Sequence, residues 1–180
     1  MTDLKTEAAV EFTTAPVTQL WRRQGIALLR ILFGVVWGID AWFKWQPDFI
    51  NNFSSYLTSD NQPPAVAWWI NLWINIIKVD PHVFAHLVAI GETAIALALI
   101  LGVFSNLTYF GGTLISIIIW TTAEGFGGPY QAGATDIGAA IIYVLVFAGL
   151  FLSQAGIVWG YDLQLGKKLG KYSWLASGKE

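Results

Sequence analysis

At 180 residues, the chain is 55 % hydrophobic and only 12 % charged, with a net charge of −2. A soluble domain carries about twice this share of charged residues, so the composition indicates a membrane protein. The small negative charge excludes a basic field for nucleic acid, and the absence of cysteine excludes disulfides, thiolate metal sites and iron–sulfur clusters held by this chain.

Four apolar segments follow a polar start. Residues 1–20 contain acidic side chains and no long apolar run, so we expect a mobile cytoplasmic tail. A helix needs about 20 apolar residues to cross a bilayer core about 30 Å thick. The segments that approach this length are residues 25–43, 83–104, 107–123 and 135–152. The sequence therefore predicts an all-α membrane protein, a four-transmembrane-helix antiparallel bundle within residues 21–160, with a cytoplasmic C-terminal tail at 161–180.

The long connection between the first two of these segments contains a further helical pattern. Over residues 65–78, large apolar side chains recur at helical spacing and polar ones fall on the other side, which favours an interfacial helix. A short helix folded over the end of the bundle fits the same pattern. Asp80 followed by Pro81 is typical of the start of the next helix.

Lysine and arginine predict the orientation. Basic residues concentrate on the side of the membrane that holds both termini, and few lie on the other side. The positive-inside rule then places both termini in the cytoplasm of a multi-pass protein in the cell membrane. The two sets are Lys5, Arg22, Arg23, Lys167, Lys168, Lys171 and Lys179 against Lys44 and Lys78.

Two ionisable residues fall inside predicted membrane helices. Arg30 lies near the inner end of the first, and Glu92 lies near the middle of the second. Charges at this depth are costly, so each requires a partner or a function. A structural Arg30–Glu92 ion pair is allowed by the predicted depths. The alternative is that one of the two handles a proton, an anion or a quinone oxygen.

A second polar group gathers at the predicted outer helix ends. Asp40 and Lys44 are four residues apart on the first helix, His86 lies one turn into the second, Glu124 ends the third and Asp136 begins the fourth. Each has an ordinary structural explanation, such as a helix ion pair or a favourable dipole interaction. Their convergence from four helices favours a site that opens toward the outer face.

The connection from Glu124 to Asp136 is rich in glycine. Its Gly127 and Gly128 can bring backbone N–H groups close to an anion, with Tyr130 beside them. The spacing of the glycines does not match a nucleotide-binding loop. A simple re-entrant turn is the structural alternative.

Several runs of sequence resemble one family of membrane proteins. Residues 22–153 are similar to the DoxD family, within the DoxX-like group of four-helix membrane proteins. The most specific runs are Glu-Gly-Phe-Gly-Gly-Pro-Tyr at 124–130 and Gly-Ala-Thr-Asp-Ile-Gly at 133–138; Leu-Arg-Ile-Leu-Phe-Gly at 29–34 and Asp-Ala-Trp-Phe-Lys-Trp-Gln-Pro at 40–47 support them.

This resemblance implies a thiosulfate:quinone oxidoreductase. Such an enzyme joins two thiosulfates into tetrathionate and passes two electrons to membrane quinone. The family works with a second small subunit, DoxA, sometimes fused behind this one. No such segment follows here, so we expect a separate DoxA-like subunit, a homo-oligomer, or both.

The polar residues named above are compatible with this chemistry. We expect the catalytic groups to be Glu92, Glu124, Asp136 and His86. We expect substrate to be bound by Arg30, Asp40, Lys44, Trp45, Gly127, Gly128 and Tyr130. The two histidines, His82 and His86, share one helix face and cannot clamp a haem from opposite sides within one subunit. Quinone is therefore the expected electron acceptor, with no metal, haem or flavin. The alternative function is a non-catalytic membrane anchor or accessory subunit of a quinone-linked respiratory or sulfur-oxidising complex.

Overall fold

The computed structural model describes residues 3–128 and 136–178, with side chains from residue 19 onward. Every regular element in these ranges is a helix, and none is a strand. The long helices are α1 (Asp3–Lys44), α4 (Pro81–Leu101), α5 (Ser105–Thr121) and α6 (Ala140–Leu152). The short ones are α2 (Pro47–Asn51), η1 (Phe53–Tyr56), α3 (Pro64–Ile77), η2 (Gly125–Gly127), α7 (Asp162–Leu169) and η3 (Gly170–Leu175).

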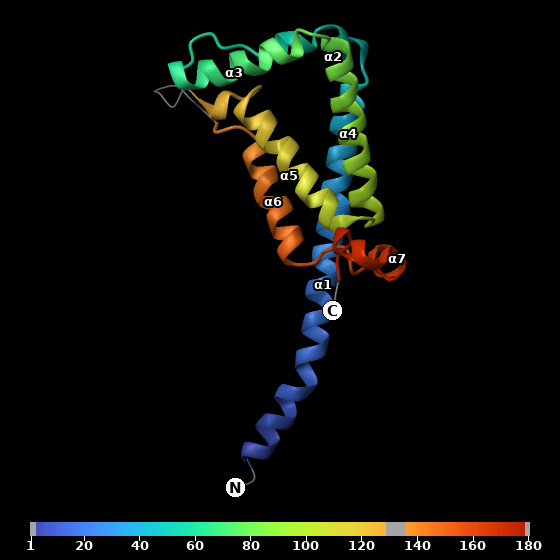
Figure 1. The fold of residues 1–180 in the computed structure, drawn as a ribbon. Helices are drawn as coiled ribbons and strands as arrows, with labels where there is room; N and C mark the ends of the chain where they lie inside the picture. The colour runs from blue at the N-terminus through green and yellow to red at the C-terminus, as the bar shows by residue number, and fades with distance from the viewer. Residues whose placement is uncertain (1–2, 129–135, 179–180) are drawn as a thin grey trace.

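The long helices pack in two pairs. Helix α1 runs beside α4, and α5 beside α6, while α4 and α5 meet through the short turn that joins them (Figure 1). Helix α3 lies across the end of the molecule opposite the N-terminus and contacts η2 (Figure 1). Helix α3 therefore covers one end of the two helix pairs (Figure 1).

An aromatic cluster holds the two pairs together. Phe33 and Trp37 of α1 meet Phe147 of α6 edge to face, with ring centroids 5.0 and 5.4 Å from that of Phe147. Such contacts add about 0.5–1.5 kcal/mol per pair to the burial of the rings. Close approach of α1 to α4 depends on Gly34, because a Cβ there would lie 2.9 Å from Leu99 Cβ. The core thus lies around the middle of the long helices.

Two helices are long and apolar enough to cross a membrane, Gln19–Lys44 within α1 and Pro81–Leu101. Only 33 % of each apolar window is buried, whereas the core helix of a soluble protein is mostly buried. Large side chains such as Phe110 and Leu145 are exposed by 71 % and 68 % on α5 and α6. These exposed apolar faces favour lipid as the surrounding solvent. Helices α5 and α6 fall short of the span length, at 17 and 13 residues.

The predicted boundaries need four corrections. Helix α1 already begins at Asp3, within the segment expected to be a tail. Helix α4 ends at Leu101 because Gly102 adopts φ +61°, which terminates the helix. Helix α5 begins two residues earlier than expected, at Ser105. Helix α6 begins at Ala140 rather than 135, because Gly138 at φ +90° interrupts the regular backbone. The interfacial segment is helical as predicted, over Pro64–Ile77, and Asp80 caps α4 through Val83 N at 3.1 Å.

The C-terminal residues are packed against the bundle. Asp162, at the start of α7, is fully buried and accepts hydrogen bonds from Ser105 N at 3.2 Å and Ser177 N at 2.8 Å. Asn106 Nδ2 donates to the carbonyls of Trp174 and Ala176, each at 3.0 Å. Residues 162–177, expected to be a tail, are therefore docked on the start of α5.

Candidate functional site

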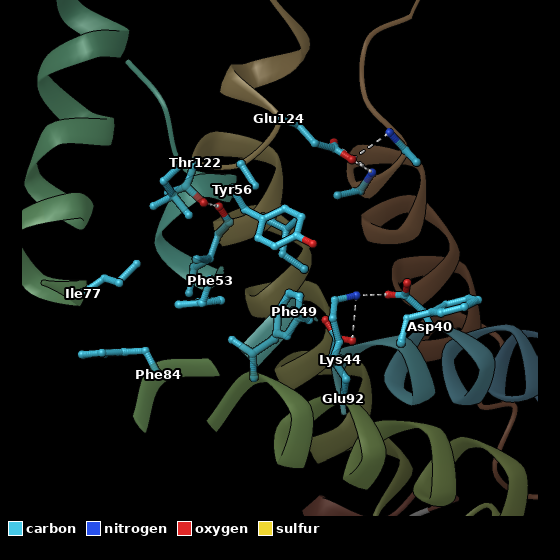
Figure 2. A pocket seen from close by; sticks show the side chains of 18 of the residues that line it. Asp40, Lys44, Phe49, Phe53, Tyr56, Ile77, Phe84, Glu92, Thr122 and Glu124 are labelled. Atoms are coloured by element: carbon cyan, nitrogen blue, oxygen red, sulfur yellow. Dashed lines mark hydrogen bonds and ion pairs between the residues drawn. The ribbon is translucent and has the colours of Figure 1, made fainter. Parts of the chain in front are cut away.

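A charged cluster joins α1 to α4 inside the bundle. Lys44 Nζ donates to Asp40 Oδ2 at 2.8 Å and lies 3.3 Å from Glu92 Oε2 (Figure 2). The Glu92 side chain is fully buried, and its two oxygens accept no hydrogen bond of good geometry within the described residues. A buried carboxylate with unused acceptor capacity is costly unless a ligand or a proton completes it. We call Asp40, Lys44 and Glu92 the charged triad.

Local sequence places the triad. Asp40 and Lys44 are one turn apart at the C-terminal end of α1, so both side chains leave the same face of that helix. A cation there also complements the helix dipole. Glu92 lies near the middle of α4, which is held against α1 by the close approach at Gly34. The neighbouring helix therefore brings the carboxylate within reach of the ammonium group.

The triad borders a cavity of about 670 Å³ beneath α3. Its walls come from all four long helices and from α2, η1 and α3, and they are mainly apolar. Aromatic side chains surround the space, including Trp37, Phe49, Phe53, Tyr56, Phe84 and Tyr143 (Figure 2). A mainly apolar cavity of this size with a few polar groups in its walls is typical of a small-molecule site.

Glu124 also borders this cavity, but its carboxylate is occupied. Its Oε1 accepts from Ala139 N at 3.2 Å, and its Oε2 accepts from Ala140 N at 3.2 Å (Figure 2). These are the first N–H groups of α6, which has no cap of its own. Glu124 therefore caps α6 and interacts favourably with its dipole.

Asp136 lies outside the cavity. It is exposed, and its Oδ1 accepts from Ile137 N at 2.6 Å and from Gly138 N at 3.1 Å. This local bond pattern fixes the turn that leads into α6. The structure therefore does not bring Asp136 to the triad.

Gly127 and Gly128, in the described part of the glycine-rich connection, do not offer free N–H groups for an anion. Gly127 N donates to Glu124 O at 2.7 Å, and Gly128 N donates to Gly125 O at 3.1 Å. Backbone carbonyls of the protein thus accept from the two N–H groups that we expected to hold a substrate. Gly127 has φ +72° and lies against Ile137 O, so a side chain there has no room. Tyr130 lies outside the described residues.

His86 and Trp45 form a separate exposed pair. The two rings meet at 73° with centroids 6.2 Å apart, and neither residue borders the cavity. Trp45 Nε1 donates to Thr93 Oγ1 at 3.0 Å, and His86 Nδ1 lies 2.7 Å from His82 O. The pair links the end of α1 to α4 on the outer surface of the two helices.

Arg30 and Glu92 do not form the ion pair that their predicted depths allowed. Lys44 forms the ion pair with Glu92 instead. Arg30 lies fourteen residues before Lys44 on α1, which is about 21 Å along the helix axis. Arg30 is fully buried and donates from Nη2 to Trp159 O at 2.7 Å. Its Nη1 packs against Gly102 and Gly160. Arg30 therefore lies at the end of the molecule opposite α3, where it holds the segment after α6.

Sequence reasoning missed two groups of residues. The aromatic walls lie on short helices whose packing cannot be inferred from spacing, although the Phe and Tyr content of residues 47–57 was a signal. Buried Asp162 was missed because it follows the last apolar segment and reads as a surface residue. Of the residues expected at the site, the structure brings Asp40, Lys44, Glu92 and Glu124 to one cavity.

Neither a family model, nor a curated protein, nor a solved structure matches this chain. Within the described residues, no group of three or more His, Asp or Glu side chains is placed to hold a metal ion. The residues around the cavity are therefore the best indication of what this chain binds.

Proposed function

We propose that this chain is the quinone-reducing membrane subunit of a thiosulfate:quinone oxidoreductase. All four long helices cross the cell membrane, both termini lie in the cytoplasm, and the cavity under α3 binds the quinone ring. The observation that carries this proposal is a buried, unsatisfied carboxylate, Glu92, on the wall of an aromatic-lined cavity. Thiosulfate is proposed as the electron donor because several runs of the sequence resemble the DoxD family.

The cavity suits a quinone because its parts match the parts of that molecule. Aromatic side chains can stack on a planar ring, and apolar walls accept the beginning of an isoprenoid tail. Lys44 can donate a hydrogen bond to a quinone oxygen, which becomes stronger as negative charge develops on that oxygen. Glu92, in its protonated form, can deliver one of the two protons that reduction requires.

The overall reaction balances in electrons and protons. Two thiosulfate dianions lose two electrons as a new sulfur–sulfur bond joins them into tetrathionate. The quinone gains these two electrons and two protons and becomes quinol. No metal, haem or flavin takes part in this proposal.

Thiosulfate does not fit beside the triad as well as quinone does. Two carboxylates surround the one ammonium group of Lys44, so the ionised triad is net negative and repels a dianion. The N–H groups of Gly127 and Gly128 already donate to backbone carbonyls. We therefore propose that a second, DoxA-like subunit or another copy of this chain completes the thiosulfate site near the outer end.

Quinone binding tests the cavity. The chain has ten tryptophans, and Trp37 and Trp73 border the cavity, so a short-tailed quinone should quench the fluorescence of the detergent-solubilised protein. Val88→Trp fills the cavity, whereas Leu87→Trp, one residue away, adds the same ring on an exposed face. We expect Val88→Trp to abolish saturable quenching and Leu87→Trp to retain it. Equal binding by both variants would refute the cavity assignment.

A redox assay tests the reaction. Membranes that contain the protein and its partners should reduce quinone when thiosulfate is added, and Glu92→Gln should remove most of this activity while the protein still accumulates. The alternative is an anchor or accessory subunit, in line with exposed aromatic side chains such as Trp68 on α3, which is 67 % exposed. Wild-type turnover in Glu92→Gln membranes would favour that alternative.

A further inference from the structure

A groove runs along the outside of the molecule between α1 and α6. Helix α1 packs mainly on α4, and α6 packs mainly on α5, so the side on which α1 and α6 face each other is only partly filled. The groove has a volume of about 430 Å³ and is bordered almost entirely by apolar side chains. Ile26 and Leu29 of α1 form one wall, and Leu145, Val146 and Gly149 of α6 lie on the other.

The inner end of this groove continues into a smaller, polar pocket. This pocket has a volume of about 160 Å³ and includes Arg23, Ser153 and Gln154. Ile26 and Ser153 border both spaces, so the polar pocket and the apolar groove are adjacent. The apolar groove matches the acyl chain of a phospholipid, and the cationic polar pocket matches its phosphate.

The basic side chains near the polar pocket indicate which class of lipid would bind there. Arg23 is exposed at the polar pocket, and Arg22 precedes it. Helix α7, which carries exposed Lys167 and Lys168, lies at this same end of the molecule (Figure 1). The acidic side chain nearest in sequence to these lysines, Asp162, is buried against two backbone N–H groups. The end is therefore cationic and complements an anionic headgroup.

We propose that the groove between α1 and α6 binds an anionic phospholipid of the inner leaflet, with an acyl chain along α6 and the phosphate at Arg23. The inference rests on the membrane placement of α1 and α6 and does not depend on quinone chemistry. It assigns a second ligand site, which shares no bordering residue with the aromatic cavity.

Gly149 offers a direct test of the acyl-chain part. A Cβ at Gly149 meets no atom within 4 Å, so a phenylalanine there fills the groove without disturbing the helix. Gly111 on α5 is equally open and borders no described groove, which makes Gly111→Phe the matched control. We expect purified wild type and Gly111→Phe to retain phosphatidylglycerol in native mass spectrometry, and Gly149→Phe to lose it.

Arg23 tests the headgroup part. Arg23→Gln should lower the preference for phosphatidylglycerol over phosphatidylcholine about five-fold, the usual effect of one basic residue near an anionic lipid. Arg22→Gln, one residue away and outside the pocket, should change this preference less. Soluble glycerol phosphate should not compete, because the acyl chain supplies most of the binding.

Four results would overturn the proposal. The first is a wild-type protein that binds no added phosphatidylglycerol after delipidation. The second is equal lipid binding by Gly149→Phe and Gly111→Phe. The third is competition by glycerol phosphate, which would make the pocket a site for free phosphate. The fourth is a dimer that Gly149→Phe alone dissociates, which would show that another copy fills the groove. Loss of quinone binding in Val88→Trp is measured separately and leaves this inference unaffected.

Discussion

Lys44 is the residue on which the charged triad depends. Its ammonium group lies between two carboxylates, one of which, Glu92, is fully buried. Removal of one partner from a buried ion pair costs about 3–5 kcal/mol, because the remaining charge is left without compensation. Replacement of both partners by neutral groups costs much less.

A double-mutant cycle measures this dependence. Lys44→Met should lower thermal stability in detergent strongly, and Lys44→Met combined with Glu92→Gln should recover much of the loss. Tryptophan fluorescence melts of the two single variants and the double variant would give the coupling energy. Losses that simply add would show that Lys44 and Glu92 do not stabilise each other.

At this scale, the sequence identified the ionisable residues and one of their pairings. Arg30 and Glu92 were singled out by their depth in apolar segments, and Asp40 with Lys44 by their spacing of four residues, which the structure confirms as an ion pair. The Arg30–Glu92 pairing was wrong, because Lys44 binds Glu92 and Arg30 donates to the carbonyl of Trp159. Lys44 reaches Glu92 because it lies on the α1 face that packs on α4, and rotation about a helix axis depends on tertiary contacts.

Helices α5 and α6 both begin on carboxylates that other segments supply. Neither has a side-chain cap of its own, and Asp162 and Glu124 accept hydrogen bonds from their first N–H groups. Uncompensated N–H groups at a helix start are costly where no water reaches them. These two carboxylates therefore stabilise the second helix pair at both of its starts.

Glu124 should show this role in a graded series. Glu124→Ala removes both acceptors and should cost about 0.5–2 kcal/mol, the range for a lost helix cap. Glu124→Gln keeps one acceptor oxygen and should cost less. Hydrogen exchange at the start of α6 would report the difference, and equal exchange in the two variants would argue against a capping role.

Asp162 should control the docking of the C-terminal segment. Asp162→Ala leaves Ser105 N and Ser177 N without their acceptor, and about 1–3 kcal/mol per buried group is the expected cost. Limited proteolysis after α6 should become faster. Asp136→Ala, at an exposed turn, serves as the control, and the same cleavage rate in both would exclude a specific role for Asp162.

The element boundaries followed from the sequence wherever the signal was local. Apolar length predicted α4 and α5 to within a few residues, and Asp80 with Pro81 fixed the start of α4. Apolar side chains at helical spacing predicted α3. The late start of α6 and the docked α7 were not predictable, because both depend on hydrogen bonds between segments distant in the chain.

The molecule as a whole consists of two helix pairs covered at one end by α3 (Figure 1). Large apolar side chains are exposed on the outer faces of all four long helices. Helix α6 is about 20 Å long at 1.5 Å per residue, shorter than a bilayer core of about 30 Å. A four-span arrangement therefore requires the segment before α6 to lie within the bundle, where Glu124 and Trp120 bind it.

Labelling of single cysteines tests this arrangement. The chain has no cysteine, so a single introduced thiol has no background. A membrane-impermeant maleimide should label Lys78→Cys in intact cells and Lys171→Cys only after permeabilisation. Both positions are exposed, so access is limited by the membrane alone. Labelling of both in intact cells would place them on the same side and refute the orientation.

The position of Asp162 in the chain has a consequence for the order of synthesis. Ser105 N donates to the carboxylate of Asp162, which lies 57 residues later in the chain and is therefore translated later. The first turn of α5 therefore lacks this acceptor until Asp162 has been synthesised. Docking of residues 162–177 on the start of α5 is thus a late step in the folding of this helix pair.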